Sequence, residues 1–453
     1  MSIQKKASKS YEMDMCNGAI FSKIVAFAVP LILSGLLQLL FNAADIIVVG
    51  RFAGSESLAA VGSTSALISL LVNVFIGLSI GANVLVAQFY GAQKQKDLEE
   101  TVHTAMMLAA VGGVVLIAVG ILLADPLLTL MGTPDDVLPL AALYMKIFFV
   151  GMPVTLIYNF GSAILRAVGD TKRPLYFLLL AGVINVVLNL FFVIQFHMGV
   201  AGVALATVIS QCVSAALIVR CLAKTEAPYK LKKECLKFTS RKLAMIARIG
   251  LPAGLQGAIF SISNVLIQSS VNSFGSVAMA GSTASANIEG FVYTSMNAVY
   301  QTALSFTSQN YGARKFDRMT RILIYCLGLV AVVGLVMGGG SVLFGHQLLG
   351  IYSSDAEVIR YGMDRLRIIC SLYFISGMMD TMVGGLRGMG CSIVPMLVSL
   401  TGACAFRVLW IFTIFSMNRT LQTLYLSYPV SWTITLLAHV ICYVLIRRKL
   451  AKR

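Results

Sequence analysis

The sequence QFYGAQK at residues 88–94 returns as QNYGARK at residues 309–315, 221 residues further along the chain. A second pair of segments has the same offset, because LRAVGDTKRP at 165–174 corresponds to LRGMGCSIVP at 386–395. Separate matches at one offset indicate an internal duplication, as some secondary transporters have. Both motifs lie in polar segments that connect one apolar run to the next. We therefore interpret them as structural features of inner helix ends, with Gly permitting tight turns and Arg anchoring to lipid headgroups.

The composition is that of a membrane protein. The 453 residues are 58% hydrophobic and 12% charged, whereas soluble domains typically carry about 25% charged residues. Apolar runs long enough to cross a hydrocarbon core of about 30 Å recur from end to end. These runs are long and continuous, which favours helices over a β-barrel. The net charge of +16 comes from basic residues gathered between the runs, which is typical of topology signals and not of nucleic-acid binding.

Twelve membrane spans are predicted, six in each half of the chain. The second, fourth, eighth and tenth are rich in Gly, Ser, Thr and Asn, so hydropathy marks them weakly. The predicted spans are 22–48, 56–88, 102–124, 139–163, 174–196, 200–223, 243–272, 278–308, 320–344, 357–385, 393–416 and 421–446.

The segment 224–242 is the largest polar interruption and is predicted to be a basic cytoplasmic linker. It separates an N-terminal six-helix lobe, residues 1–223, from a C-terminal lobe, residues 243–453. Pro30 and Pro252 lie in the first span of each lobe, 222 residues apart. The predicted fold is an all-α polytopic membrane protein with twelve transmembrane helices in two pseudo-symmetric six-helix bundles. Because six helices return the chain to its starting side, the repeat is parallel.

Alternate loops differ in charge and predict the orientation. Most of the Lys and Arg residues lie in one set of loops, beginning with Lys5, Lys6 and Lys9, whereas the other set is acidic or neutral. The positive-inside rule therefore places both termini in the cytoplasm of a bacterial-type plasma (inner) membrane. The residues before the first span lack the apolar core of a signal peptide, so we expect the first apolar run to be a retained helix.

Several segments resemble the multidrug and toxic compound extrusion (MATE) family: VPLILSGLLQLLFNAADIIVVGRFAG, the paired YGA segments, LRAVGDTKRP and GVAGVALAT. The resemblance extends from residue 20 to residue 448. It implies two six-helix lobes and an antiporter that couples H⁺ or Na⁺ to the export of organic, cationic or lipophilic, compounds such as drugs by alternating access. A flippase for a lipid-linked precursor or a polysaccharide, from the same superfamily, is the alternative.

Asp45 is the predicted cation-coupling residue. Of the 19 acidic residues, only Asp45, Glu289 and Asp380 lie within predicted spans away from a loop, and ionisable residues at such positions usually mark functional sites. By resemblance, three polar side chains join Asp45 in the N-terminal lobe: Asn185, Asn189 and Thr207.

Asn185 and Asn189 are four residues apart and share a helix face. One branch of the family has a second Asp where this chain has Asn189. One carboxylate with amide and hydroxyl oxygens can hold a proton or coordinate Na⁺, and no other metal site is expected. The alternative is that Asp45 is an interfacial residue or an interhelical hydrogen-bond partner.

Glu289 and Asp380 are candidate carboxylates of the C-terminal lobe, either to attract a cationic substrate or to titrate. The alternative for Glu289 is a hydrogen bond within the bundle. Arg407 is expected to pair with Asp380 or Glu289, or to extend toward the membrane surface. The intramembrane charges are expected to be mainly acidic, whereas a pyrophosphate flippase should have an Arg-lined cavity.

Flexible Met and aromatic side chains suit apolar cations, so a substrate-cavity wall is predicted from these residues: Met296, Met378, Met379, Met382, Tyr293, Tyr300 and Tyr373. Ordinary helix packing is the alternative for these side chains.

An enzyme is not expected, because no convergent His, Cys, Ser or metal constellation is visible. The nine Cys residues are scattered without ligand spacing, which gives little support to a metal site or a disulfide frame. No cofactor is expected apart from the coupling ion, H⁺ or Na⁺. The expected partners are small organic substrates and the lipid bilayer, with no nucleic acid, and the protein is expected to be a monomer.

Overall fold

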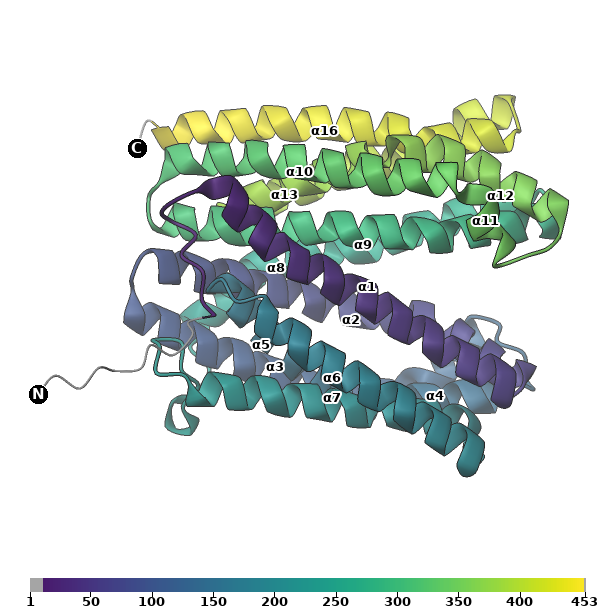
Figure 1. Cartoon of the computed structure of the whole chain (residues 1–453), viewed down its shortest axis with the longest axis horizontal. Helices are drawn as coiled ribbons and strands as arrows, with labels where there is room; N and C mark the ends of the chain where they lie inside the picture. Colours follow the sequence, from purple (N-terminus) through teal and green to yellow (C-terminus); the bar gives the residue numbers. More distant parts are fainter. Residues whose placement is uncertain (1–10, 452–453) are drawn as a thin grey trace, which may run out of the picture.

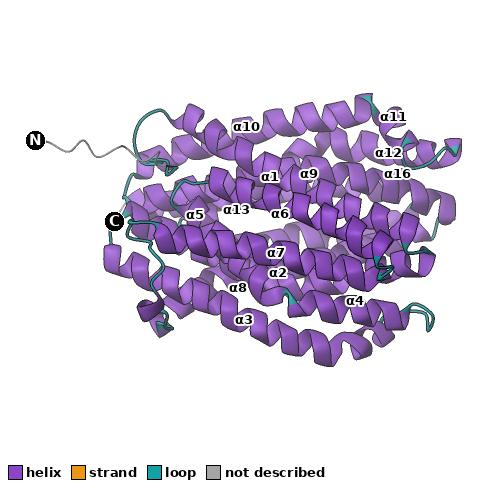
Figure 2. Ribbon diagram, turned by 60° about the horizontal axis from the view of Figure 1, so that its bottom comes forward, coloured by secondary structure: helices purple, strands orange, loops and turns teal. Residues whose placement is uncertain are grey.

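The computed structural model of the chain describes residues 11–451, and all the elements in that range are helices (Figures 1 and 2). The first half consists of α1 (Ile20–Phe52), α2 (Ser55–Gly91), α3 (Gln95–Leu130), α4 (Leu138–Val150), α5 (Met152–Ala167), α6 (Lys172–Leu190), η1 (Phe191–Gln195) and α7 (Gly199–Lys224). A short turn, η2 (Lys233–Cys235), lies between the halves. The second half consists of α8 (Ser240–Asn272), α9 (Ser276–Gly312), α10 (Phe316–Leu343), α11 (Gly345–Gly350), α12 (Ala356–Ile369), η3 (Cys370–Leu372), α13 (Tyr373–Gly388), α14 (Ile393–Ser399), η4 (Leu400–Ala405), α15 (Phe406–Trp410), η5 (Ile411–Phe415) and α16 (Leu421–Ala451).

The twelve predicted spans all correspond to helical segments. Among the described residues, ten helices are long and apolar enough to cross a membrane, and α4 with α5 forms an eleventh span bent by 49°. The twelfth is α9, a helix of 37 residues rich in Ser, Thr and Asn. It packs among α1, α2, α10, α12 and α13. Because neighbouring helices cover much of its surface, α9 can be more polar than a helix that faces lipid.

The first helix of each half crosses to the other half. Ile24 and Phe27 of α1 are buried in one core cluster with Phe306 of α9. Ile246 and Ile249 of α8 are buried in the cluster that the N-terminal half forms. Figure 1 shows α1 running obliquely across the boundary between the halves. The linker therefore divides the sequence, but the two halves do not pack as separate bundles. The start of α1 packs with the second half, and the start of α8 packs with the first half.

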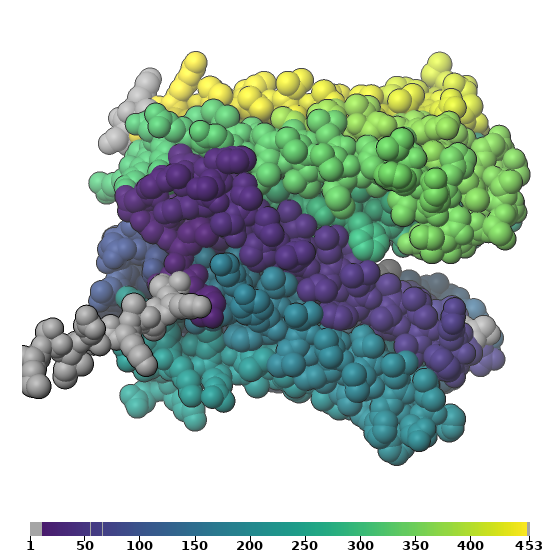
Figure 3. Space-filling view, in the orientation of Figure 1, coloured from purple at the N-terminus to yellow at the C-terminus, as the bar shows by residue number. Residues whose placement is uncertain are grey.

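The start of α1 and the end of α16 lie at one end of the molecule, which we call the inner end; there α2 ends at Gly91 and α9 ends at Gly312 (Figure 1). Lys5, Lys6 and Lys9, on which the predicted orientation partly rests, lie outside the described residues. Toward the opposite end the two halves separate, and the space-filling view is hollowed between them (Figure 3). The structure is therefore closed at the inner end and open at the other.

The repeated motifs close the inner end by packing against each other. A Cβ atom on Gly91 would overlap the backbone of Gln309, and one on Gly312 would overlap the backbone of Gln88. Glycine is therefore required where α2 and α9 cross. The expectation that Gly91 and Gly312 make turns is wrong, because the left-handed residue of the first motif is Gln93, with φ of 56°; in the LRxxG motifs it is confirmed, because Gly169 and Gly390 have φ of 97° and 84°.

Two equivalent hydrogen bonds join the halves at the same place. The Gln88 side chain donates Nε2–H to the carbonyl oxygen of Gly388 at 2.9 Å. The Gln309 side chain donates Nε2–H to the carbonyl oxygen of Ala167 at 2.7 Å. Each Gln opens a QxYGAxK motif and each carbonyl belongs to an LRxxG motif of the other half. The duplicated sequences thus form a pseudo-twofold seal, which we call the inner seal.

The N-terminal segment at residues 11–18 crosses the inner seal. Glu12 accepts hydrogen bonds from the hydroxyls of Tyr90 at 3.0 Å and Tyr229 at 2.5 Å. Met15 is fully buried, and its carbonyl accepts a hydrogen bond from Asn310 Nδ2 at 3.1 Å. Because Tyr90 belongs to the first half and Asn310 to the second, this segment adds contacts that hold the inner end closed.

The basic linker between α7 and α8 is docked onto α3. Lys232 Nζ lies 2.8 Å from Glu99 Oε1, and the Lys232 backbone N–H donates to His103 Nε2 at 2.9 Å. The hydrogen bond that Lys232 donates to the Glu99 carboxylate raises the pKa of Lys232 above its usual value. Lys242, which is buried at the start of α8, forms an ion pair with Asp97. The ion pairs of Lys232 and Lys242 with α3 thus hold the linker and the start of α8 against the first half.

Candidate functional site

The four residues predicted for cation coupling lie together in the first half. Asn189 donates its side-chain N–H groups to Asp45 Oδ1 and, at 3.3 Å, to Asn185 Oδ1. Asn185 donates to Thr207 Oγ1 at 3.3 Å, and Thr207 donates to the Val203 carbonyl at 3.0 Å. The contributing helices are α1, α6 and α7. Their predicted proximity is confirmed, and we call these four side chains the Asp45 cluster.

The Asp45 cluster is rich in oxygen and poor in positive charge. No described Lys or Arg nitrogen lies within 4.0 Å of the Asp45 carboxylate. Asn189 is fully buried, and its Oδ1 atom has no hydrogen-bond partner among the described residues. A buried acceptor without a partner costs about 1–3 kcal/mol. A carboxylate beside an unsatisfied carbonyl oxygen is a suitable environment for a proton or a hard cation such as Na⁺.

Glu289 is paired within the second half. Arg365 of α12 donates Nε–H to Glu289 Oε1 at 2.7 Å and Nη2–H to Oε2 at 2.8 Å, and Ser285 donates to Oε1 at 3.0 Å. Arg365 also donates to Ser282 at 2.8 Å. Such a bidentate pair satisfies both partners. This geometry favours the structural alternative for Glu289, and the sequence analysis did not single out Arg365 as its partner.

The expectations for Arg407 are wrong. Its Nε–H donates to Ser431 Oγ at 2.9 Å, and its guanidinium lies 4.3 Å from the centre of the Tyr428 ring. No described carboxylate lies within 4.0 Å of it, so it pairs with neither Glu289 nor Asp380. The side chain is 3% exposed and does not extend toward the membrane surface.

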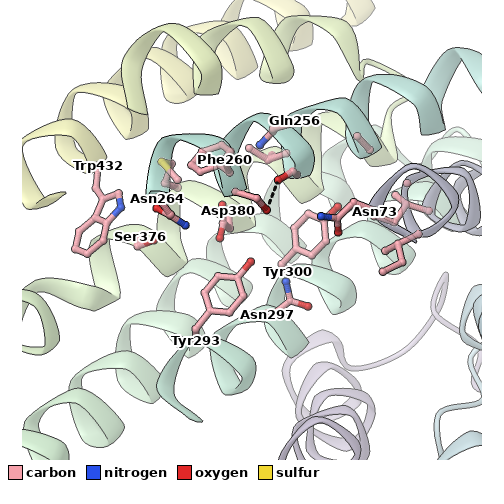
Figure 4. Close-up of a pocket in the computed structure, with 18 of the residues that line it drawn as sticks. Asn73, Gln256, Phe260, Asn264, Tyr293, Asn297, Tyr300, Ser376, Asp380 and Trp432 are labelled. Carbon is pink, nitrogen blue, oxygen red and sulfur yellow. Dashed lines mark hydrogen bonds between the residues drawn. The ribbon is translucent and has the colours of Figure 1, made fainter. Parts of the chain in front are cut away.

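A cavity of about 500 Å³ lies between α2 and the second half. We call it the central cavity; Figure 4 shows its side chains arranged around Asp380. Asp380 and Tyr300 line it, as predicted for a substrate site. Its defining residues come from α2, α8, α9, α13, α15 and α16 and include Asn73, Gln256, Tyr300, Asp380, Arg387, Arg407 and Trp432.

Three of the predicted cavity residues lie elsewhere. Met296 and Met382 are buried in separate core clusters, and Met378 packs beside the cluster that contains Met296. The predicted residues Met379, Tyr293 and Tyr373 do line the cavity, and on α13 the lining face carries Met379 and Asp380. A sequence without coordinates gives no sign of which side of a Met-rich helix faces a cavity, so the expectation for Met296, Met378 and Met382 is wrong.

Arg387 is the functional candidate that sequence reasoning misplaced. Instead of anchoring to headgroups, it is 5% exposed and lines the central cavity. Its Nη1–H donates to the Tyr300 hydroxyl and its Nη2–H to Gln256 Oε1, both at 2.8 Å. The cavity wall therefore carries Arg387 and Arg407 against one carboxylate, Asp380. The expectation of mainly acidic intramembrane charge is wrong for this cavity.

A sequence model of the MatE family matches residues 30–191 and residues 252–413, once in each half. The chain belongs to the MatE family. The two matches start 222 residues apart, which is the offset between Pro30 and Pro252. Because this is a family of transporters, the function of the chain is membrane transport. The match in each half agrees with the duplicated, all-helical architecture.

Several relatives and solved structures match most or nearly all of the chain. The probable multidrug resistance protein YoeA of Bacillus subtilis is 28% identical over 427 residues, which is 92% of each chain. A protein of Shewanella oneidensis named FAD transporter is 26% identical over 73% of this chain and 74% of its own length. The outward-facing structure of a multidrug resistance MATE transporter superposes with a TM-score of 0.92 at 22% identity, covering 99% of this chain and 100% of that one.

Proposed function

We propose that this protein is a cation-coupled antiporter that exports small organic compounds, drugs among them, across a bacterial-type plasma membrane by alternating access. Na⁺ or H⁺ binds at the Asp45 cluster, and the compound binds in the central cavity. Both termini are cytoplasmic in this proposal, so the inner seal closes the cytoplasmic side, and the protein acts as a monomer. The observation that carries the proposal is the partnerless, buried Asn189 Oδ1 beside a carboxylate without a basic partner.

The path of α1 supplies a physical link between ion and substrate. Asp45 lies on the part of α1 that contacts α6, whereas Phe27 lies in the core of the second half. Between them, a Cβ atom on Gly35 would overlap the side chain of Thr294, the neighbour of the cavity residue Tyr293. A change in the position of α1 when a cation binds at Asp45 therefore acts on the cavity wall. Moving one charge through 100 mV supplies about 2.3 kcal/mol for this change.

Dye efflux from proteoliposomes tests the proposal. Rhodamine B and its ethyl ester, which share one ring system, are loaded separately, and Na⁺ and H⁺ gradients are imposed separately. We expect one gradient to drive export of at least one dye, and we expect Asp45→Asn to abolish gradient-dependent export without lowering expression. Asp135→Asn, in an exposed loop, is the matched control and should transport normally. Normal gradient-driven export by Asp45→Asn would remove Asp45 from the mechanism.

A flippase for a lipid-linked precursor or a polysaccharide is the second candidate. The observation in its favour is the pair of buried arginines, Arg387 and Arg407, in the cavity wall. The family relatives named as multidrug proteins favour export of small compounds. Reconstituted protein that moves a fluorescent polyprenyl pyrophosphate between leaflets, but exports neither dye, would favour the flippase.

A further inference from the structure

We propose that the central cavity binds aromatic compounds that carry an anionic group, zwitterions included, with Arg407 and Arg387 as the anion-binding side chains. The inference deepens the proposed function, because it takes the central cavity as the substrate site and names the substrate class. It departs from the cationic substrate expected from the sequence. The buried arginines of the cavity wall are the reason for the difference.

Arg407 is a buried cation with no anionic partner in the described chain. Among the described residues, Arg407 donates a hydrogen bond only to the neutral hydroxyl of Ser431. Contact with the Tyr428 ring offsets part of the cost of burying the charge. An unpaired charge in this position is costly, and in membrane proteins it marks a substrate path. A substrate anion that binds and leaves is a partner that satisfies the guanidinium transiently.

The backbone around Arg407 is specialised. Arg407 lies on the five-residue segment α15, which is bounded by the π-helical segments η4 and η5. Short π-helical segments within α-helices occur frequently at functional sites. This irregular span therefore gives a second, independent indication that the placement of Arg407 serves binding.

Arg387 is a second buried positive charge in the cavity wall. The Tyr300 hydroxyl and the Gln256 amide oxygen hold its guanidinium, and its Nε atom is buried without a partner. Asp380 is the single acidic residue that lines the cavity beside Arg387 and Arg407. The lining thus has an excess of one positive charge when all three are ionised. An anionic group balances this excess, and Asp380 can accept an ammonium group of a zwitterion.

The cavity walls are suited to planar rings. Tyr373 and Trp432 stack with ring centres 5.3 Å apart, and Phe260 and Tyr293 lie on other sides of the cavity (Figure 4). Aromatic walls favour stacked or edge-on contact with an aromatic ligand. The volume of about 500 Å³ lies within the range of pockets for drug-sized molecules. A carboxylate, sulfonate or phosphate attached to a ring system matches both the charge and the walls.

Equilibrium binding of rhodamine B and its ethyl ester tests the inference, because the two dyes differ only in a free carboxylate. Fluorescence anisotropy is measured on the purified full-length protein without any ion gradient. We expect the free acid to bind about tenfold more tightly than the ester, as for one charge-assisted hydrogen bond. Arg407→Gln should remove this preference. Arg407→Lys should retain most of it, and the exposed control Arg419→Gln should retain all of it.

Equal or tighter binding of the ester, binding of neither dye, or an equal loss of both dyes in Arg407→Gln would overturn the inference. Failure of the proposed function gives a different result. If the preference for the free acid holds but no gradient drives export, the coupling proposal alone fails. If a gradient drives export and the ester is the tighter ligand, the assignment of substrate class alone fails.

Discussion

Removing the two hydrogen bonds of the inner seal should shift the protein toward a state that is open at the inner end. Gln88 and Gln309 each donate one side-chain hydrogen bond across the halves, at 2.9 and 2.7 Å. When the seal opens, water replaces these bonds, so only their net contribution is lost. That contribution is about 1 kcal/mol for each bond. One Gln→Ala change should therefore raise the ratio of inner-open to inner-closed protein about fivefold, and the double change about thirtyfold.

Spin labels on the two inner loops report this ratio. In a background without the native cysteines, Lys94 and Arg314, which are both exposed, are each replaced by Cys and labelled with a nitroxide. Pulsed electron–electron double resonance then measures the distance between the two labels. The population at the longer distance should grow in Gln88→Ala and in Gln309→Ala, and most in the double variant. Gln93→Ala is the control, because the Gln93 side chain is exposed and donates to the Tyr90 carbonyl oxygen in the last turn of α2, within the same half.

Two results would refute the reasoning. The first is an unchanged distance distribution in the double variant, which would mean that the repeated motifs do not hold the inner end closed. The second is an equal shift in Gln93→Ala, which would mean that any change in these loops has the same effect. A double variant that shifts no further than a single one would show that the two bonds are not independent.

Three further changes test the packing. Gly91→Ala should force α2 and α9 apart and lower the melting temperature of the purified protein, because its Cβ would overlap backbone; an unchanged melting temperature would contradict this crossing. Glu289→Gln should destabilise the protein by about 3–5 kcal/mol, since it leaves Arg365 buried without its ion pair; Glu357→Gln, in an exposed pair, should be nearly neutral. Glu12→Ala removes two tyrosine hydrogen bonds, so proteolysis of the N-terminal segment should become faster.

The fold could be predicted from the sequence because its signals are long and repeated. Twelve spans and the duplication follow from apolar runs and a constant offset. The exchange of α1 and α8 between the halves could not be predicted. Apolar residues such as Ile24 and Ile246 look alike whether they pack within their own half or against the other. Gly91 carried a signal, although its role is close helix packing and not a turn.

For the candidate site too, the sequence predicts some of the residues and not others. The Asp45 cluster could be predicted, because a carboxylate within an apolar run is conspicuous and Asn185 and Asn189 share a helix face. The partners of Arg365, Arg387 and Arg407 could not, since an Arg near the end of a span can face headgroups, a carboxylate or a cavity. Only the packing of α12, α13 and α15 decides among these. The charge of the central cavity therefore depends on tertiary structure.

Direct measurement of cation binding tests the role of the Asp45 cluster without a substrate. Purified protein is titrated with Na⁺ in weakly buffered solution while bound Na⁺ and released protons are counted, in parallel with Asp45→Asn and with Asp135→Asn as control. We expect the unmodified protein and Asp135→Asn to bind a Na⁺ ion or a titratable proton that Asp45→Asn lacks. Identical binding of Na⁺ and protons by all three proteins would contradict cation coupling at Asp45.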